Sequence, residues 1–325
     1  MKIFISGATG YLGQKLAWKL ADSGKKVNVL IRNPKSAIYL NHPNISIYHG
    51  DILEIQHIRK AIKDCDLVFH LAALVREWSN PPNDILKTNI EGTKNMIQAA
   101  EENGIRKFIQ SSASCVIGPS LKMANNEFTP RWSSFNNIYE ISKFLADQEL
   151  SKRVENGFPG IIAYPTRIFG PGIFSEGALV NKIIFQFLKN KIAFVPKYQS
   201  FINNYAFIDD VVNGLIHAGN IGIVGEKYIL GGENIQLKLL FKTIKKFNKD
   251  NGLILEVPLS AIHSFSWSTS LFKRQTVITP DMVNLMKHNF EFNCKKASSE
   301  LNYHITPFDL AMEKTIVTLL NRRPS

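Results

Sequence analysis

Short apolar runs alternate with longer amphipathic stretches through the first half of the chain. Runs rich in Val, Ile and Phe predict buried strands. The stretches between them, such as residues 85–103, repeat apolar side chains with helical spacing. This alternation is typical of βαβ units around a parallel sheet. The predicted strands are residues 2–6 (KIFIS), 26–31 (KVNVLI), 45–49 (ISIYH), 67–71 (LVFHL), 107–111 (KFIQS) and 160–164 (GIIAY).

The pattern changes after residue 165. PTRIFGPGIFSEG is a Gly- and Pro-rich loop, and the remainder mixes helical stretches, short strands and aromatic-rich connections. We therefore predict an α/β protein in which a doubly wound parallel sheet is followed by a smaller C-terminal lobe. A chain of 325 residues is long enough for this division.

The composition is that of an ordinary globular protein, with 45% apolar and 20% charged residues. No apolar run approaches the roughly 18 residues of a membrane helix, and the opening MKIFISG lacks the apolar stretch of a secretory signal. Cys65, Cys115 and Cys294 are widely separated and odd in number, so we expect a reducing, cytoplasmic setting. Neither the cysteines nor the eight histidines show ligand spacing, so we expect no metal.

The net charge of +12 raises the question of a nucleic-acid or anionic-membrane partner. The basic residues are spread out, however, and the densest stretch, FKTIKKFNKDNG (241–252), predicts the solvated face of a helix. We therefore expect no nucleic acid and no membrane span. The charge is interpreted as a feature that favours solubility and anionic ligands.

The first predicted strand runs into FISGATGYLG, a glycine-rich stretch at the start of a helix. Glycines there let the backbone turn tightly and approach a pyrophosphate, whose charge is met by the helix N-terminus. A tight turn without a ligand is the plain alternative, but the strand before and the helix after predict a dinucleotide. The predicted contacts are Gly7, Ala8, Thr9, Gly10, Tyr11, Leu12 and Gly13.

An acidic residue usually follows the second strand of such a unit and binds the adenosine ribose. Here no Asp or Glu occurs between Asp22 and Asp51, and the second strand is followed by Arg32 and Lys35. An arginine at this point can stack on adenine and bind a 2′-phosphate, which favours NADP over NAD. An exposed arginine without that role is the alternative.

Tyr139 lies four residues before Lys143, so both side chains share one face of a predicted helix. The pair is either catalytic or a coincidence of spacing, because Tyr11 and Lys15 have the same spacing. Tyr11, however, lies within the glycine-rich stretch, where a redox tyrosine could not reach the nicotinamide end.

Motifs along nearly the whole chain resemble those of the extended short-chain dehydrogenase/reductase superfamily. Its dihydroflavonol reductase-like branch, which includes hopanoid-associated sugar epimerases, is the most similar; ALVREWSNPPNDILKTNIEGT, with Trp78, and SKFLADQEL carry that closer match. The superfamily motifs, in order, are SGATGYLG, HGDILE, VFHLAA, KTNIEGT, SSASCVIG, IYEISKF, PTRIFGPG, YAFIDDVV and GEKYILGGEN.

The resemblance implies a Rossmann domain of residues 1–164 with a return segment near 203–220, and a substrate-binding lobe of residues 165–202 and 221–325. It also implies that Tyr139 gives a proton to a carbonyl oxygen, while Lys143 binds the nicotinamide ribose. Lys143 and the oxidised nicotinamide are expected to lower the pKa of Tyr139 below its usual value of about 10. His70 is expected to contact the cofactor loop rather than act as a base. Further implied cofactor contacts are Asp51, Ile52, Leu71, Ala72, Ala73, Asn89, Pro165, Thr166 and Arg167.

A hydroxyl at the end of the fifth strand orients the carbonyl in this superfamily. Counting from the paired serines gives Ser112, with Ser114 next, whereas counting back from Gly118 gives Ala113, which has no hydroxyl. We predict Ser112.

The function predicted is an NADP-dependent oxidoreductase that acts on a ketone or secondary alcohol of a small molecule, as a homodimer. The alternatives are an NAD-dependent nucleotide-sugar epimerase or dehydratase, and a non-catalytic cofactor sensor or RNA-binding protein. Substrate specificity is assigned to residues 75–82, residues 119–137 and the lobe beyond residue 165. Four aromatic residues could line the substrate site or belong to the core: Trp132, Phe169, Phe201 and Tyr205.

Overall fold

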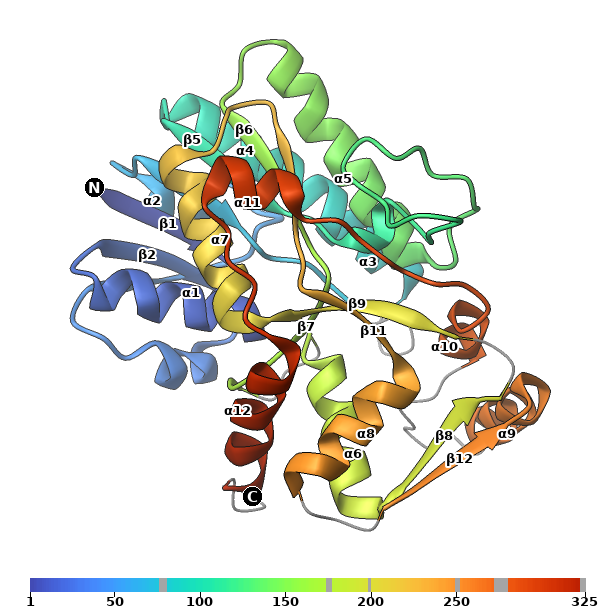
Figure 1. Ribbon diagram of the computed structural model, residues 1–325. Coiled ribbons are helices and arrows are strands. Elements are labelled where there is room, and N and C mark those ends of the chain that lie inside the picture. Colours follow the sequence, from blue (N-terminus) through green and yellow to red (C-terminus); the bar gives the residue numbers. More distant parts are fainter. Residues whose placement is uncertain (76–80, 174–176, 198–199, 249–251, 272–279, 322–325) are drawn as a thin grey trace.

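The computed structural model describes the chain except for residues 76–80, 174–176, 198–199, 249–251, 272–279 and 322–325 (Figure 1). Its centre is a seven-stranded sheet in the order β10-β6-β5-β4-β1-β2-β3, in which all neighbours pair in parallel. The strands are β1 (Lys2–Ser6), β2 (Lys26–Ile31), β3 (Ile45–His49), β4 (Leu67–His70), β5 (Lys107–Ser111), β6 (Gly160–Pro165) and β10 (Lys227–Leu230). The six predicted strands are confirmed to within one residue at each end, as is the doubly wound α/β class.

Helices cover both faces of this sheet. The helix predicted over residues 85–103 is divided into α3, a π-helical turn η2 and α4. The other helices of the first half are α1 (Tyr11–Asp22), η1 (Pro34–Leu40), α2 (Ile55–Ile62), α3 (Pro82–Leu86), η2 (Lys87–Glu91), α4 (Gly92–Glu102), η3 (Ser114–Val116) and α5 (Ile138–Glu155). Those of the second half are α6 (Leu179–Asn190), α7 (Ile208–Ile221), α8 (Leu237–Asn248), α9 (Leu259–Leu271), α10 (Pro280–Leu285), α11 (Lys295–Leu301) and α12 (Phe308–Leu320).

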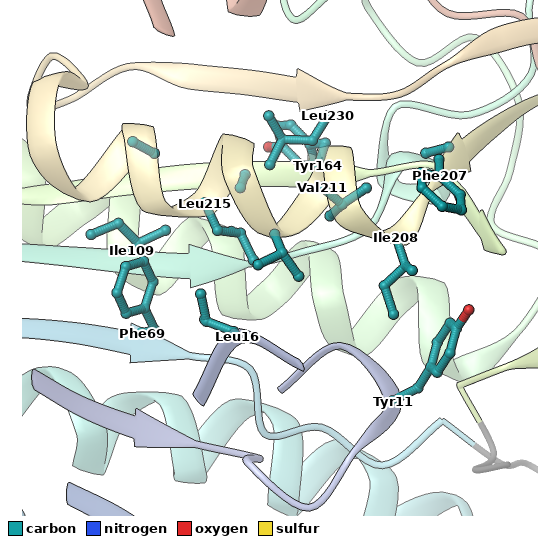
Figure 2. Packing of buried hydrophobic residues seen from close by; sticks show 14 of the residues in the cluster. Tyr11, Leu16, Phe69, Ile109, Tyr164, Phe207, Ile208, Val211, Leu215 and Leu230 are labelled. Carbon is teal, nitrogen blue, oxygen red and sulfur yellow. The ribbon is translucent and has the colours of Figure 1, made fainter. Parts of the chain in front are cut away.

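The core lies between the sheet and its helices. Figure 2 shows Val211 and Leu215 of α7 directed at the sheet, beside Phe69 of β4 and Ile109 of β5. All four side chains are fully buried. Strands covered on both faces are apolar throughout rather than alternating, which is why short apolar runs predicted them correctly.

A smaller lobe lies below the large sheet in Figure 1. It contains a three-stranded sheet in the order β11-β9-β7 and a two-stranded sheet of β8 and β12. Helices α6, α8 and α12 pack together beside them. The strands are β7 (Arg167–Phe169), β8 (Ile192–Pro196), β9 (Ile202–Phe207), β11 (Glu233–Gln236) and β12 (Leu253–Val257).

Two segments beyond residue 221 lie with the large sheet rather than with the lobe. Strand β10 pairs in parallel with β6, and α11 packs against α7 and β10. The predicted lobe of residues 221–325 therefore has to be revised at these points. The reason is a crossover through α7, which returns the chain to the edge of the sheet next to β6. A four-residue run such as KYIL does not reveal which sheet it joins.

In the part of the chain that the structure describes, no helix combines the length and the apolar character needed to cross a membrane.

Candidate active site

The glycine-rich loop between β1 and α1 requires glycine at two positions. Gly7 has a φ of +75°, and a Cβ there would lie 2.6 Å from the amide nitrogen of Ala72. A Cβ on Gly13 would lie 2.2 Å from the carbonyl oxygen of Gly7. The loop is therefore folded tightly against the segment after β4, and a side chain at either position would force them apart.

The start of α1 is suited to an anion. Gly10 is the N-cap residue, no side chain caps the helix, and its first turn contains no acidic residue. The first amide groups and the helix dipole therefore offer donors and partial positive charge. With no side chain at Gly7, Gly10 or Gly13, this loop fits a dinucleotide pyrophosphate, as the sequence predicts.

Buried polar side chains tie this loop to β4. Ser6 Oγ lies 2.7 Å from His70 Nδ1 and accepts a hydrogen bond from the Ala72 amide at 3.3 Å. The other ring nitrogen of His70 lies 3.0 Å from the Thr93 hydroxyl. Burial lowers the pKa of His70 to about 3, so the ring is neutral and structural. It supports the segment of the predicted cofactor contacts Leu71, Ala72 and Ala73.

Arg32 and Lys35 stand exposed after β2. Arg32 Nη1 lies 4.0 Å from Asp51 Oδ2, at the edge of ion-pair distance, and its side chain is 66% exposed. Such a loose, solvated pair constrains the guanidinium little, so it can turn to a ligand. Ile52, the other predicted contact here, is buried.

Asn89 lies in the π-helical turn η2 and joins the cofactor side to the helix α5. Its Oδ1 accepts from the Leu74 amide at 2.8 Å, and its Nδ2 donates to the Leu74 carbonyl at 3.0 Å and to Ser142 Oγ at 2.8 Å. Ser142 in turn donates to the Tyr139 carbonyl at 2.8 Å. Because both amide protons are used by protein acceptors, Asn89 connects the segment after β4 to the helix α5 and has no amide proton left for the cofactor contact that the sequence predicted.

Tyr139 and Lys143 lie on the first turns of α5. Asn137 is the N-cap of this helix and accepts from the Glu140 amide at 2.9 Å, which fixes the start of the helix at Ile138. The Lys143 ammonium donates to the Ser111 carbonyl oxygen at 2.7 Å. The pair is thereby held at the carboxyl end of β5, the edge of a parallel sheet at which ligands bind.

An acidic side chain in the first turn of α5, Glu140, anchors the loop before the helix. Glu140 forms a buried ion pair with Arg131 at 2.7 Å and accepts from the Asn136 amide at 3.1 Å. Arg131 also donates to the Cys115 carbonyl oxygen. These contacts connect part of the predicted specificity segment 119–137 to the active-site helix.

The Ser112 hydroxyl is committed to a buried carboxylate. It donates to Asp147 Oδ2 at 2.8 Å, while Gln110 Nε2 donates to Asp147 Oδ1 at 2.7 Å. Asp147 follows Tyr139 by eight residues, which is about 12 Å along a helix. Because a hydroxyl has a single proton, Ser112 cannot donate to a substrate carbonyl while this bond is made.

Ser114, the second candidate, is buried at the start of η3, and its hydroxyl forms no hydrogen bond among the described residues. Ala113 precedes it as the N-cap. The two candidate serines therefore differ in environment: the Ser112 hydroxyl is bound to Asp147, and the Ser114 hydroxyl is available.

The electrostatics of the pair differ from the sequence expectation. Burial raises the pKa of Tyr139, and the Cys115, Asp147 and Glu140 groups act in the same direction. Burial lowers the pKa of Lys143, against which Asp147 and Cys115 act to raise it. The predicted lowering of the Tyr139 pKa is thus not produced by the chain's own groups.

Sequence reasoning missed Asp147, whose pKa burial raises to about 6 although Lys143, Ser112, Gln110 and Tyr164 favour its charged form. It lies four residues after Lys143, so extending the Tyr-x-x-x-Lys spacing by one more turn would have found it.

Pro165, Thr166 and Arg167 are the predicted cofactor contacts at the end of β6 and directly after it. Thr166 Oγ1 donates to Asn204 Oδ1 at 2.8 Å, and Pro165 ends the strand. Arg167 Nε donates to Asn203 Oδ1 at 2.5 Å.

Of the aromatic candidates, Phe169, Phe201 and Tyr205 are buried and Trp132 is exposed.

Residues 76–80, which include Trp78 and most of the first specificity segment, lie outside the described residues. Among the residues described, no group of three or more His, Cys, Asp or Glu side chains could hold a metal ion.

The fold and the site together define a nucleotide-dependent enzyme built on a parallel sheet. A model described as the NAD dependent epimerase/dehydratase family matches residues 3–231, so the chain belongs to this family. It is an NAD(P)-dependent oxidoreductase of the extended short-chain dehydrogenase/reductase kind, as the sequence motifs predict.

Relatives and solved structures agree with that membership. The chain is 27% identical to sterol demethylase protein B of Methylococcus capsulatus over 248 residues, 76% of this chain and 74% of the relative. It is 25% identical to a putative dihydroflavonol 4-reductase of Synechocystis over 308 residues, 92% and 88% of the two chains. UDP-glucose 4-epimerase of Thermotoga maritima, solved with UDP-glucose, superimposes with a TM-score of 0.81 at 19% identity, covering 98% of this chain and 99% of that one. At that identity the likeness concerns the fold alone.

Proposed function

We propose that the protein is an NADP-dependent oxidoreductase that reduces a ketone, or oxidises a secondary alcohol, of a small molecule. The observation that carries the proposal is the placement of Tyr139 and Lys143 at the carboxyl end of β5, with the Lys143 ammonium bound to the Ser111 carbonyl. When bound, the nicotinamide supplies or accepts the hydride.

The chain's own groups supply the proton chemistry. In reduction, Tyr139 gives its hydroxyl proton to the carbonyl oxygen, and Lys143 favours the resulting phenolate by its charge. The Ser114 hydroxyl is the donor that orients the carbonyl, since the Ser112 proton serves Asp147. This assignment revises the predicted role of Ser112 and keeps the second of the two serines considered.

Two basic side chains support NADP. Arg32 and Lys35 follow β2 where an acidic residue would otherwise meet the adenosine ribose, and both are exposed. A guanidinium can bind a 2′-phosphate through two parallel hydrogen bonds, which an ammonium cannot.

The cofactor proposal is tested with Arg32→Ala. The loss of a charge-assisted contact worth about 1.5–3 kcal/mol predicts roughly 10- to 150-fold weaker NADPH binding. NADH, which lacks the 2′-phosphate, should lose much less. Titration of both nucleotides by fluorescence measures this, with Lys35→Ala expected to act in the same direction more weakly.

Arg153→Ala is the matched control. Arg153 is also an exposed arginine, but it pairs with Glu101 and is distant from Arg32 in the sequence. Its affinity for both nucleotides should equal that of the wild type. Equal losses of NADPH and NADH affinity in Arg32→Ala would instead favour NAD and an epimerase or dehydratase reaction.

The relatives' names support a proposal for the substrate class. A sterol demethylase protein, a dihydroflavonol reductase and a 3-beta-hydroxysteroid dehydrogenase are among them. We infer that the substrate is a largely apolar molecule with one ketone or secondary alcohol, and that the enzyme acts in the cytoplasm, where its three free cysteines stay reduced.

A homodimer through α5 is part of the proposal. Four apolar side chains of this helix are candidates for the contact: Ile141, Phe144, Leu145 and Leu150. Leu145 is 39% exposed, whereas Leu150 belongs to the buried core and cannot contribute. Light scattering at micromolar concentration distinguishes a dimer from a 36.7 kDa monomer.

A further inference from the structure

Arg167 begins β7, directly after the carboxyl end of β6, and its side chain contacts the second lobe. Its Nε donates to Asn203 Oδ1 at 2.5 Å. The guanidinium carbon lies 5.9 Å from the centre of the Phe201 ring and 6.0 Å from that of Phe290. The head group is thus held by one amide and two aromatic rings.

No carboxylate neutralises this guanidinium. Within the described part of the chain, Arg167 forms no ion pair, and its two Nη groups donate to no protein acceptor. The side chain retains some contact with solvent, yet desolvation is the largest influence on its pKa and lowers it. A cation removed from water without a counter-charge is costly, unless a ligand supplies the charge.

Asn203 presents a second donor without an acceptor. Its side chain is fully buried, and its Nδ2 has no hydrogen-bond partner. The orientation of the amide is fixed chemically, since a guanidinium only donates and the oxygen must therefore face Arg167. The neighbouring Asn204 differs, because its Nδ2 donates to Gly232 O and Asn234 Oδ1, both at 2.8 Å.

We propose that Arg167 and Asn203 form a binding subsite for an anionic, oxygen-bearing group of the substrate. Every open group in the subsite is a donor, and one carries a full positive charge, which is the requirement of a carboxylate or phosphate. Nicotinamide and ribose, the parts of a dinucleotide nearest the hydride, do not carry such a charge. Arg167, which the sequence predicted as a cofactor contact, is therefore assigned to the substrate.

The subsite lies on the Tyr139 side of the molecule. Arg167 follows β6, which pairs in parallel with β5, and the carbonyl of Ser111 at the end of β5 holds the Lys143 ammonium. The anionic group is therefore placed at the same edge of the sheet as Lys143. The substrate class, which rests on the proposed function, is a ketone or secondary alcohol with an acidic group on a largely apolar body.

Isothermal titration of the full chain tests the subsite with three probes: benzoylformate, phenyl phosphate and the neutral benzoylformamide. Titrations are made with and without saturating NADP⁺, so that binding at the nucleotide phosphate sites is separated. We expect the preferred anion to bind at least about tenfold more tightly than the amide, as the loss of a charge-assisted contact implies. The relative affinities of carboxylate and phosphate identify the group.

Two substitutions attribute the binding to these residues. Arg167→Gln removes the charge, and Asn203→Asp provides an internal carboxylate that neutralises Arg167 with little change of volume. Both should remove the preference for the anion, and Arg167→Lys should restore part of it. Arg153→Gln, at an exposed pair, is the control and should behave as the wild type. Circular dichroism and thermal unfolding establish that each variant is folded.

Equal affinities for anion and amide in the wild type would overturn the subsite, as would an anion preference unchanged in Arg167→Gln and Asn203→Asp. A loss of NADP⁺ affinity in Arg167→Gln without any anion preference would return Arg167 to the cofactor. The failure of the proposed function has a separate sign, namely that neither NADP⁺ nor NAD⁺ binds to the wild type.

Discussion

Two Tyr-x-x-x-Lys pairs occur in this chain at the starts of two helices, and they have different surroundings. The Tyr11 hydroxyl donates to the Gly170 carbonyl at 2.7 Å and accepts from Asn181 Nδ2 at 3.0 Å. The Lys15 ammonium contacts Asp209 at 2.5 Å and the Pro171 carbonyl at 3.2 Å. The first pair therefore fastens α1 to the loop after β7 and to the helices α6 and α7.

The second pair is arranged differently. Lys143 binds a main-chain carbonyl at the end of β5 and has Asp147 one turn further along the helix. Spacing decides only that two side chains share a face of a helix. The role of the pair depends on what that face meets: in α1 it meets acceptors of the loop after β7 and of α7, and in α5 it meets the sheet edge at which ligands bind.

The largest expected effect is the difference in turnover between the variants of the two tyrosines. Tyr139→Phe should lower turnover by about 10²–10⁴-fold, the usual loss of a general acid, with nucleotide affinity unchanged. Tyr11→Phe should leave turnover within a few-fold and lower the free energy of unfolding by about 1 kcal/mol, as expected for one lost hydrogen bond. Steady-state kinetics and urea unfolding of both variants measure these outcomes. Full activity of Tyr139→Phe on the true substrate would contradict the mechanism.

The two serines extend the comparison to the partner of Tyr139. Ser114→Ala should lower turnover by about 10²-fold, the typical cost of a lost donor to a developing oxyanion. Ser112→Ala should leave turnover within a few-fold and raise the pKa of Asp147, because the carboxylate loses a hydrogen bond. Turnover measured across the pH range checks both. The opposite ranking would restore Ser112 as the catalytic hydroxyl.

The two lysines come next. Lys143→Met should weaken nucleotide binding by roughly 10- to 150-fold, the range for a lost hydrogen bond from a charged group, and should lower turnover as well. Lys15→Met breaks a partly exposed ion pair, so it should cost at most about 1 kcal/mol of stability and leave nucleotide affinity unchanged. Fluorescence titration and thermal unfolding distinguish them. A similar loss of nucleotide affinity in both variants would remove the contrast between the regions.

The smallest effect concerns the pH dependence of stability. The pKa of Asp147 is raised by burial from 3.8 to about 6, so the folded chain holds this proton more tightly than the unfolded chain. The associated stability is complete below about pH 4 and is lost as the pH rises to about 6, by at most about 3 kcal/mol. The groups that face this carboxyl are Lys143, Ser112, Gln110 and Tyr164.

Asp147→Asn cannot titrate, so its free energy of unfolding should decline less than that of the wild type between pH 4 and pH 6. Urea unfolding at several pH values measures the two slopes. Parallel curves would mean that Asp147 titrates normally and that the Lys143 region is more hydrated than its burial indicates.

The sequence by itself determined the parallel sheet, the glycine-rich loop and the family. Five of the six strands were recognisable because a strand buried on both faces is a local apolar run, whereas the edge strand β3 is only partly buried. Gly7 and Gly13 were recognisable from local requirements of the turn from β1 into α1: Gly7 has a φ of +75°, and a Cβ on Gly13 would meet the Gly7 carbonyl in the same loop. The motif order then predicted Tyr139 and Lys143 as the catalytic pair without any knowledge of their contacts.

Only the tertiary structure decided which groups are open for chemistry. Ser112 is engaged because Asp147 approaches from another element, and β10 joins the large sheet because α7 carries the chain back to β6. Arg167 lacks a counter-charge because β9 brings it an amide instead of a carboxylate. Hydrogen bonding and charge compensation depend on neighbours that are distant in sequence, and the spacing of residues along the chain does not reveal which neighbours these are.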